Sequence, residues 1–103
     1  MLNYNKAVRD RIPEIIKESG HSCNVKTLSD EEFLVQMEKK LSEEILEYQK
    51  DMNPEELADI LEVIYKIASI KGISKEELEK IRNQKAEERG AFKKNLFLIN
   101  TND

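Results

Sequence analysis

Residues 29–72 read SDEEFLVQMEKKLSEEILEYQKDMNPEELADILEVIYKIASIKG, and the architecture of the chain follows from them. Ser29 and Glu32 form a capping box, in which each side chain satisfies a free backbone N–H at the start of a helix. Apolar residues then recur at helical spacing. We therefore expect a helix over about 30–50.

A second helix begins only a few residues later. Asn53 is a good N-cap, and Pro54 fits the first helical position, where no backbone N–H is needed. The apolar pattern continues to about residue 71 and stops at Gly72, so we expect the second helix over 54–71. Such a short turn predicts that the two helices lie antiparallel.

The flanking segments add further elements: a short helix within 11–19, an extended segment or loop over 23–28, a helix over about 75–89, and an apolar tail. The 75–89 helix has its own capping box, Ser74 with Glu77, and a glycine stop at residue 90. The tail, FKKNLFLI, is compatible with a short strand or a packed extension. The sequence predicts an all-α antiparallel helical bundle in a single domain, 1–103.

Composition narrows the possible functions. The chain has 103 residues, 39% of them hydrophobic and 37% charged, and a net charge of −4. This acidic balance argues against binding to duplex nucleic acid, and no apolar run is long enough to span a bilayer. The N-terminus lacks the order of a secretory signal, and Cys23 has no second cysteine to pair with. A cytoplasmic protein is expected.

Acidic residues crowd the two central helices. Glu44 falls inside the apolar stripe of the first helix, Glu47 at its shoulder, and Glu43 further out, while Glu56 and Asp59 lie on a widened apolar flank of the second. Two carboxylates about 5 Å apart repel by roughly 3 kcal/mol at an effective dielectric near 20. The acids are therefore protonated, splayed into water as a solvated helix face, or neutralised by a divalent cation. Oxygen ligands suit Mg²⁺ or Mn²⁺.

Three segments together carry a family resemblance. KLSEEILEY followed by EELADILEV resembles the EExxE…ExxD signature of MazG-like, all-α nucleoside triphosphate pyrophosphohydrolases. The opening YNKAVRDRIPEII and the closing ISKEELEKIRNQKAEERGAFKKNLFL are similar to those of a small subfamily related to phosphoribosyl-ATP pyrophosphohydrolase. Ala91 departs from that subfamily, in which a second glycine is usual at this place.

The resemblance implies an activity and a site. It implies Mg²⁺-dependent hydrolysis between the α and β phosphates, which yields a nucleoside monophosphate and pyrophosphate. The implied metal ligands are Glu44, Glu47, Glu56 and Asp59. Glu43 would orient the attacking water or support the ligands. The substrates implied are non-standard or surplus nucleoside triphosphates, with phosphoribosyl-ATP as a narrower alternative.

Basic residues complete the predicted site. Lys6, Arg9 and Arg11 lie in the N-terminal segment, Lys40 precedes the acidic motif by one helical turn, and Arg89 ends the last helix. Lysine and arginine match phosphate oxygens, so we expect these residues to contact the polyphosphate. The alternative is an ordinary charged surface with local salt bridges.

Two further interpretations remain open at this stage. The 54–71 helix is apolar over a wider arc than one neighbouring helix covers. Together with the oligomerisation that the family resemblance implies, this predicts a homodimer or a dimer of dimers. A catalytically inactive helical interaction module, which binds a partner through these apolar faces, is the alternative from a different functional class.

Overall fold

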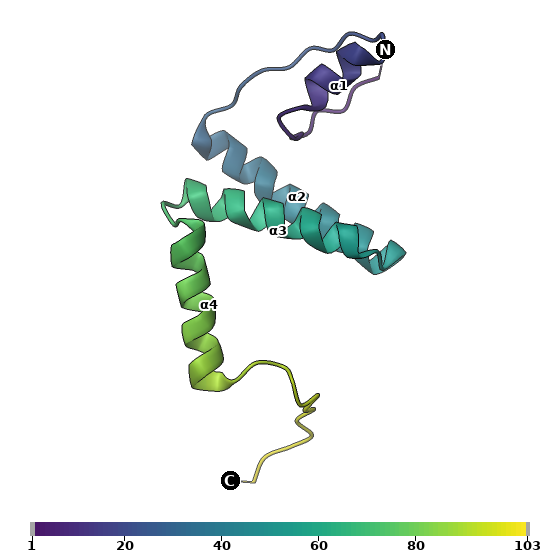
Figure 1. Ribbon diagram of the computed structural model, residues 1–103. Helices are drawn as coiled ribbons and strands as arrows, with labels where there is room; N and C mark the ends of the chain where they lie inside the picture. Colours follow the sequence, from purple (N-terminus) through teal and green to yellow (C-terminus); the bar gives the residue numbers. More distant parts are fainter. Residues whose placement is uncertain (1, 103) are drawn as a thin grey trace.

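The computed structural model describes residues 2–102, which form helices joined by turns and extended segments (Figure 1). In chain order the helices are α1 (Ile12–Glu18), α2 (Asp30–Asp51), α3 (Pro54–Ile70) and α4 (Lys75–Arg89). Within residues 2–102 there is no strand, so the apolar tail adopts neither of the two structures expected for it: it is extended, unpaired and exposed. The predicted all-helical class is confirmed, and none of these helices has the length and apolar character needed to cross a bilayer.

Side-chain caps define the two long central helices as the sequence predicted. The Ser29 hydroxyl accepts a hydrogen bond from the Glu32 backbone N–H at 3.2 Å, and the Glu32 carboxylate accepts one from the Ser29 N–H at 3.1 Å. The Asn53 side chain accepts one from the Glu55 N–H at 2.9 Å at the start of α3. Only Met52, in the left-handed region with φ 55°, and Asn53 separate α2 from α3. The tight turn makes the two helices an antiparallel pair.

The core lies between α2 and α3, which make the main helix–helix contact of the fold. Met37 and Val63 are buried at its centre, with Phe33, Leu41 and Ile67 packed around them. Ala7 joins the same cluster and is only 8% exposed. Burial of Ala7 holds the N-terminal segment against the helix pair, although α1 itself contributes no buried residue.

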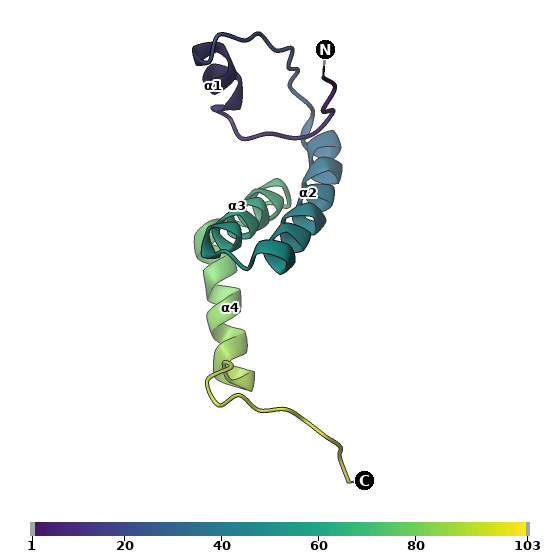
Figure 2. The ribbon, with the colours of Figure 1, turned by 90° about the vertical axis from the view of Figure 1, so that its right-hand side faces the viewer.

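Helix α4 leaves the central pair instead of lying along it (Figures 1 and 2). It contacts α3 and makes no comparable contact with α2. Its sequence explains this, because KEELEKIRNQKAEER offers only Leu78, Ile81 and Ala86 for burial. Within one chain, the expected antiparallel bundle is therefore represented by the α2–α3 pair alone among the described residues. The result is an elongated molecule of 62 × 32 × 24 Å.

Candidate functional site

Three carboxylates meet where α2 ends and α3 begins. Glu47 and Asp51 lie on the last turn of α2, and Glu56 lies on the first turn of α3. One carboxylate oxygen from each residue lies within 4.8 Å of the others. Residues four apart on a helix share a face, which aligns Glu47 with Asp51, and the two-residue turn brings Glu56 beside them. The fold itself therefore concentrates negative charge at this end of the hairpin.

Glu56 experiences this crowding most strongly. Its Oε2 atom is buried and has no hydrogen-bond partner among the described residues. Desolvation, followed by a hydrogen bond with Asp51 and by the negative charges of Asp51, Glu47 and Glu44, raises the pKa of Glu56 to about 7. The crowding therefore favours either a proton on Glu56 or a cation beside it.

The other two predicted ligands are held by basic side chains. Lys40 Nζ lies 3.7 Å from Glu44 Oε1, and both side chains are largely buried, at 18% and 15% exposed. Arg9 Nη2 donates a hydrogen bond to Asp59 Oδ1 at 2.7 Å. Neither Glu44 nor Asp59 belongs to the group of oxygens within 4.8 Å. The structure therefore brings together Glu47 and Glu56 of the four predicted ligands, with Glu44 close enough to raise the pKa of Glu56.

Asp51 is not among the predicted ligands. The first central helix was expected to end at about residue 50, whereas α2 continues through Asp51. The available signal was its spacing of four residues from Glu47, which puts both acids on one helix face if the helix extends that far.

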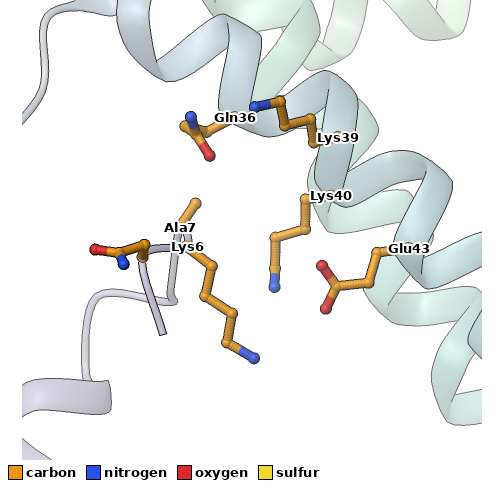
Figure 3. Close-up of a pocket in the computed structure, with 7 residues that line it drawn as sticks. Lys6, Ala7, Gln36, Lys39, Lys40 and Glu43 are labelled. Atoms are coloured by element: carbon orange, nitrogen blue, oxygen red, sulfur yellow. The ribbon is translucent and has the colours of Figure 1, made fainter. Parts of the chain in front are cut away.

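A cavity lined mainly by basic side chains lies between the N-terminal segment and α2 (Figure 3). Its volume is about 230 Å³. The lining residues are Asn5, Lys6, Ala7, Gln36, Lys39, Lys40 and Glu43. In Figure 3 the ends of the Lys6, Lys40 and Glu43 side chains face a common space. Three lysines against one glutamate make this cavity suited to an anion such as phosphate.

Sequence reasoning found part of this cavity. Lys6, Lys40 and Glu43 were predicted site residues, and all three line it. Lys39 and Gln36 were missed, because their contribution depends on where the N-terminal segment lies against α2. The packing of Ala7 against the core, which sets that position, has no local signature in the sequence.

Two residues predicted to contact phosphate do not pair with any of the predicted metal ligands. Arg11 pairs with Glu14 at 3.2 Å, and both side chains are well exposed, which matches the alternative of a local surface salt bridge. Arg89 is the last residue of α4, whose first turn follows the end of α3. A helix rises about 1.5 Å per residue, so Arg89 lies roughly 20 Å along α4 from that junction. Within one chain it is remote from the hairpin turn.

The donor set fits a small divalent ion. All the converging groups are carboxylate oxygens, the hard ligands that Mg²⁺ and Mn²⁺ prefer. Ligand oxygens about 2.1 Å from an octahedral Mg²⁺ lie roughly 3–4 Å apart, which is compatible with oxygens that all lie within 4.8 Å of one another. The buried, unpartnered Glu56 Oε2 is an atom that a cation would satisfy. Glu47, Asp51 and Glu56 therefore suit such an ion on chemical grounds.

Comparisons with known proteins assign no activity. No family model matches the chain, and no solved structure matches it. The chain is 50% identical over 40 residues to an uncharacterized protein of Mycolicibacterium smegmatis. That stretch is 39% of this chain and 41% of the mycobacterial protein. The match thus spans about two fifths of the length of this relative.

Proposed function

We propose that the chain is a Mg²⁺-dependent nucleoside triphosphate pyrophosphohydrolase of the MazG-like, all-α type. It would cleave between the α and β phosphates to give a nucleoside monophosphate and pyrophosphate. The observation that carries this proposal is the meeting of acids from two antiparallel helices around a buried carboxylate oxygen without a partner. The sequence resemblance supplies the reaction, and the acids it singles out lie on the α2–α3 hairpin.

The metal ligands in this proposal are the four predicted acids and one more. Glu47, Asp51 and Glu56 form the converging group, and Glu44 and Asp59 flank it. Mg²⁺, with Mn²⁺ as a substitute, is the proposed ion. Such an ion, when bound, offsets the charge of phosphate oxygens and lowers the pKa of a coordinated water.

Basic residues beside the acids would bind the polyphosphate. Lys6 and Lys40 line the cavity, Lys40 also pairs with Glu44, and Arg9 pairs with Asp59 on α3. Ammonium and guanidinium groups bind phosphate oxygens by charge-assisted hydrogen bonds. The Glu43 carboxylate lies at the cavity wall, where it can accept a hydrogen bond from a water and so orient it.

The test is release of pyrophosphate by the purified chain. A panel of standard and non-standard nucleoside triphosphates, with phosphoribosyl-ATP as a separate arm, is incubated with Mg²⁺ and assayed for pyrophosphate. We expect release from at least one nucleotide and its loss in EDTA. House-cleaning of non-standard or surplus nucleotides predicts turnover of several triphosphates, whereas turnover of phosphoribosyl-ATP alone supports the narrower alternative. No release from any of them contradicts the proposal.

A second candidate function follows from exposed apolar surface. Phe92, Leu96, Phe97, Leu98 and Ile99 in the tail are each at least 79% exposed. The radius of gyration is 18.3 Å, against about 13 Å for a compact chain of this length. We propose that a second copy covers part of this surface, giving a homodimer or a dimer of dimers. A catalytically inactive interaction module is the alternative use of the same surface.

Thermal melting distinguishes a nucleotide-binding enzyme from a catalytically inactive interaction module. A ligand that binds only the folded state must raise the melting temperature. The enzyme predicts a higher melting temperature with Mg²⁺ and a nucleotide together. An unchanged melt across the nucleotide panel supports the module.

A further inference from the structure

Two ion pairs join the proposed phosphate-binding residues to the proposed metal ligands. We name them the counterion pairs: Arg9 with Asp59, and Lys40 with Glu44. Each pair occupies one carboxylate that the proposed function gives to a metal ion. Each also occupies one cation that the proposed function gives to a phosphate. Two of the five proposed ligands are therefore paired with basic side chains of the chain itself.

The Arg9 contact is a product of the tertiary fold. Arg11–Glu14 is a local pair, three residues apart along the chain. Arg9 and Asp59 are separated by 50 residues, and their contact links the N-terminal segment to α3. Burial of Ala7 two residues earlier fixes the segment against the α2–α3 core. The fold thus delivers a guanidinium to one particular acid of the hairpin.

Both counterion pairs are weak enough to exchange. The Arg9 and Asp59 side chains are 55% and 42% exposed, and solvent screens pairs of this kind. The separation of 3.7 Å between Lys40 and Glu44 is too long for a hydrogen bond. Lysine preceding glutamate by four residues is also the less favourable order on a helix. Neither pair therefore locks its acid against a divalent ion.

We propose that the counterion pairs exchange partners when substrate binds, so that the metal ion and the polyphosphate bind with positive coupling. A divalent ion that takes the two carboxylates frees the two cations for phosphate oxygens. A polyphosphate that takes the cations frees the carboxylates for the ion, and this coupling is reciprocal by linkage. The chain should therefore bind the metal ion and the polyphosphate together more tightly than it binds either one alone. This inference rests on the proposed function.

The first test measures the metal alone, without turnover. Mn²⁺ binding is followed by its electron paramagnetic resonance signal for the unaltered chain, Arg9→Ala and Arg11→Ala. Freeing Asp59 should tighten Mn²⁺ binding in Arg9→Ala by about two- to fivefold, the range for losing a surface ion pair. Arg11→Ala removes the same charge from the same segment but releases only Glu14, so its effect should be smaller.

The second test measures the anion alone. Inorganic tripolyphosphate is titrated in EDTA into the unaltered chain, Asp59→Asn and Asp10→Asn. Asp59→Asn frees Arg9 and should bind the anion about two- to fivefold more tightly. Asp10→Asn removes an equal charge from the residue beside Arg9 and controls for the general loss of negative charge. Its effect should be smaller.

The outcomes distinguish this inference from the proposed activity. Equal Mn²⁺ affinities for Arg9→Ala and Arg11→Ala overturn the exchange, provided that helical circular dichroism is intact. Arg9→Gln, which keeps a polar side chain, must repeat the Arg9→Ala result. Failure of every variant to bind Mn²⁺ overturns both the exchange and the metal site. The expected affinity changes without pyrophosphate release support the exchange and contradict the hydrolase.

Discussion

Glu56, in the first turn of α3, lies against Asp51, the last residue of α2, so that the two carboxyl groups face one another across a turn of two residues. The pKa of Glu56 is raised to about 7, because its carboxyl group is desolvated and lies beside acidic neighbours. The folded chain therefore favours the protonated form of Glu56.

Without a divalent ion, the chain should lose stability as pH rises toward neutrality. The pKa of Glu56 is about 7 in the folded chain and 4.5 for an ordinary glutamate, so between these pH values the folded chain holds a proton that the unfolded chain releases. Protonation of Glu56 makes its full contribution to the free energy of unfolding below pH 4.5, and this contribution is lost as pH rises to about 7. Melting temperatures in EDTA at pH 5, 6, 7 and 8 measure it. Glu56→Gln should flatten the decline, and equal slopes for both proteins would refute the assignment.

Mg²⁺ should stabilise the chain most at high pH, where Glu56 is ionised. At ten times its dissociation constant, a ligand specific to the folded state adds about 1.4 kcal/mol, or roughly 5–10 °C in a domain of this size. Thermal melts at pH 8 with increasing Mg²⁺ measure this shift. Asp51→Asn should reduce it, whereas Glu79→Gln on α4 serves as the matched control and should leave it intact. A full shift in Asp51→Asn would remove Asp51 from the ligand set.

Neutralising a proposed ligand should abolish turnover without harming the fold. Glu44→Gln, Glu47→Gln and Asp59→Asn are each expected to lower pyrophosphate release by at least about 100-fold, which corresponds to about 2.7 kcal/mol of transition-state stabilisation. Helical circular dichroism should stay unchanged, and for Glu47→Gln the melting temperature should hold or rise as repulsion is relieved. Full activity in any of the three would contradict its role as a ligand.

Shortening Lys40 should weaken substrate binding. Lys40→Ala removes the ammonium shared by the cavity and Glu44, and we expect KM for the nucleotide to rise by about tenfold, or 1.4 kcal/mol. Lys39→Ala, on the same cavity wall, should raise KM by less, because Figure 3 shows its side chain directed toward Gln36 and away from Glu43. Steady-state kinetics across substrate concentration separate KM from kcat. Lys80→Ala on α4 is the control.

Association should depend on the apolar tail. If a second copy covers it, Phe97→Asp should convert a dimer into a monomer, because a buried charge without a partner is costly. Analytical ultracentrifugation of the full chain measures the change. Lys94→Asp, a charge change in the same tail, should have a smaller effect. A monomer at all concentrations of the unaltered chain would contradict the dimer.

The helices were predictable because their signals are local. The starts of α2 and α3 are indicated by two short motifs, Ser29 with Glu32 and Asn53 with Pro54. The structure forms both caps. Acid positions relative to the apolar stripe were predictable for the same reason: Glu44 is largely buried, as its place within the stripe indicated.

What the sequence could not reveal depends on contacts between distant segments. The pairing of Asp59 with Arg9 requires knowing that residues 5–9 lie against the helix pair, which follows from the burial of Ala7. The direction of α4 was unpredictable from its caps, because caps mark where a helix starts and say nothing of what it packs against. The small number of apolar residues in α4 was the one sequence feature that indicated weak packing against the other helices.

The two-residue connection between α2 and α3 has a consequence for engineering. Most surface turns accept extra residues, and the long 19–29 segment is a natural place to open the chain or insert a tag. At Met52 and Asn53, by contrast, an added residue would carry Glu56 off the end of α2 while leaving each helix intact. One inserted residue would thus keep both helices and disperse the Glu47–Asp51–Glu56 cluster.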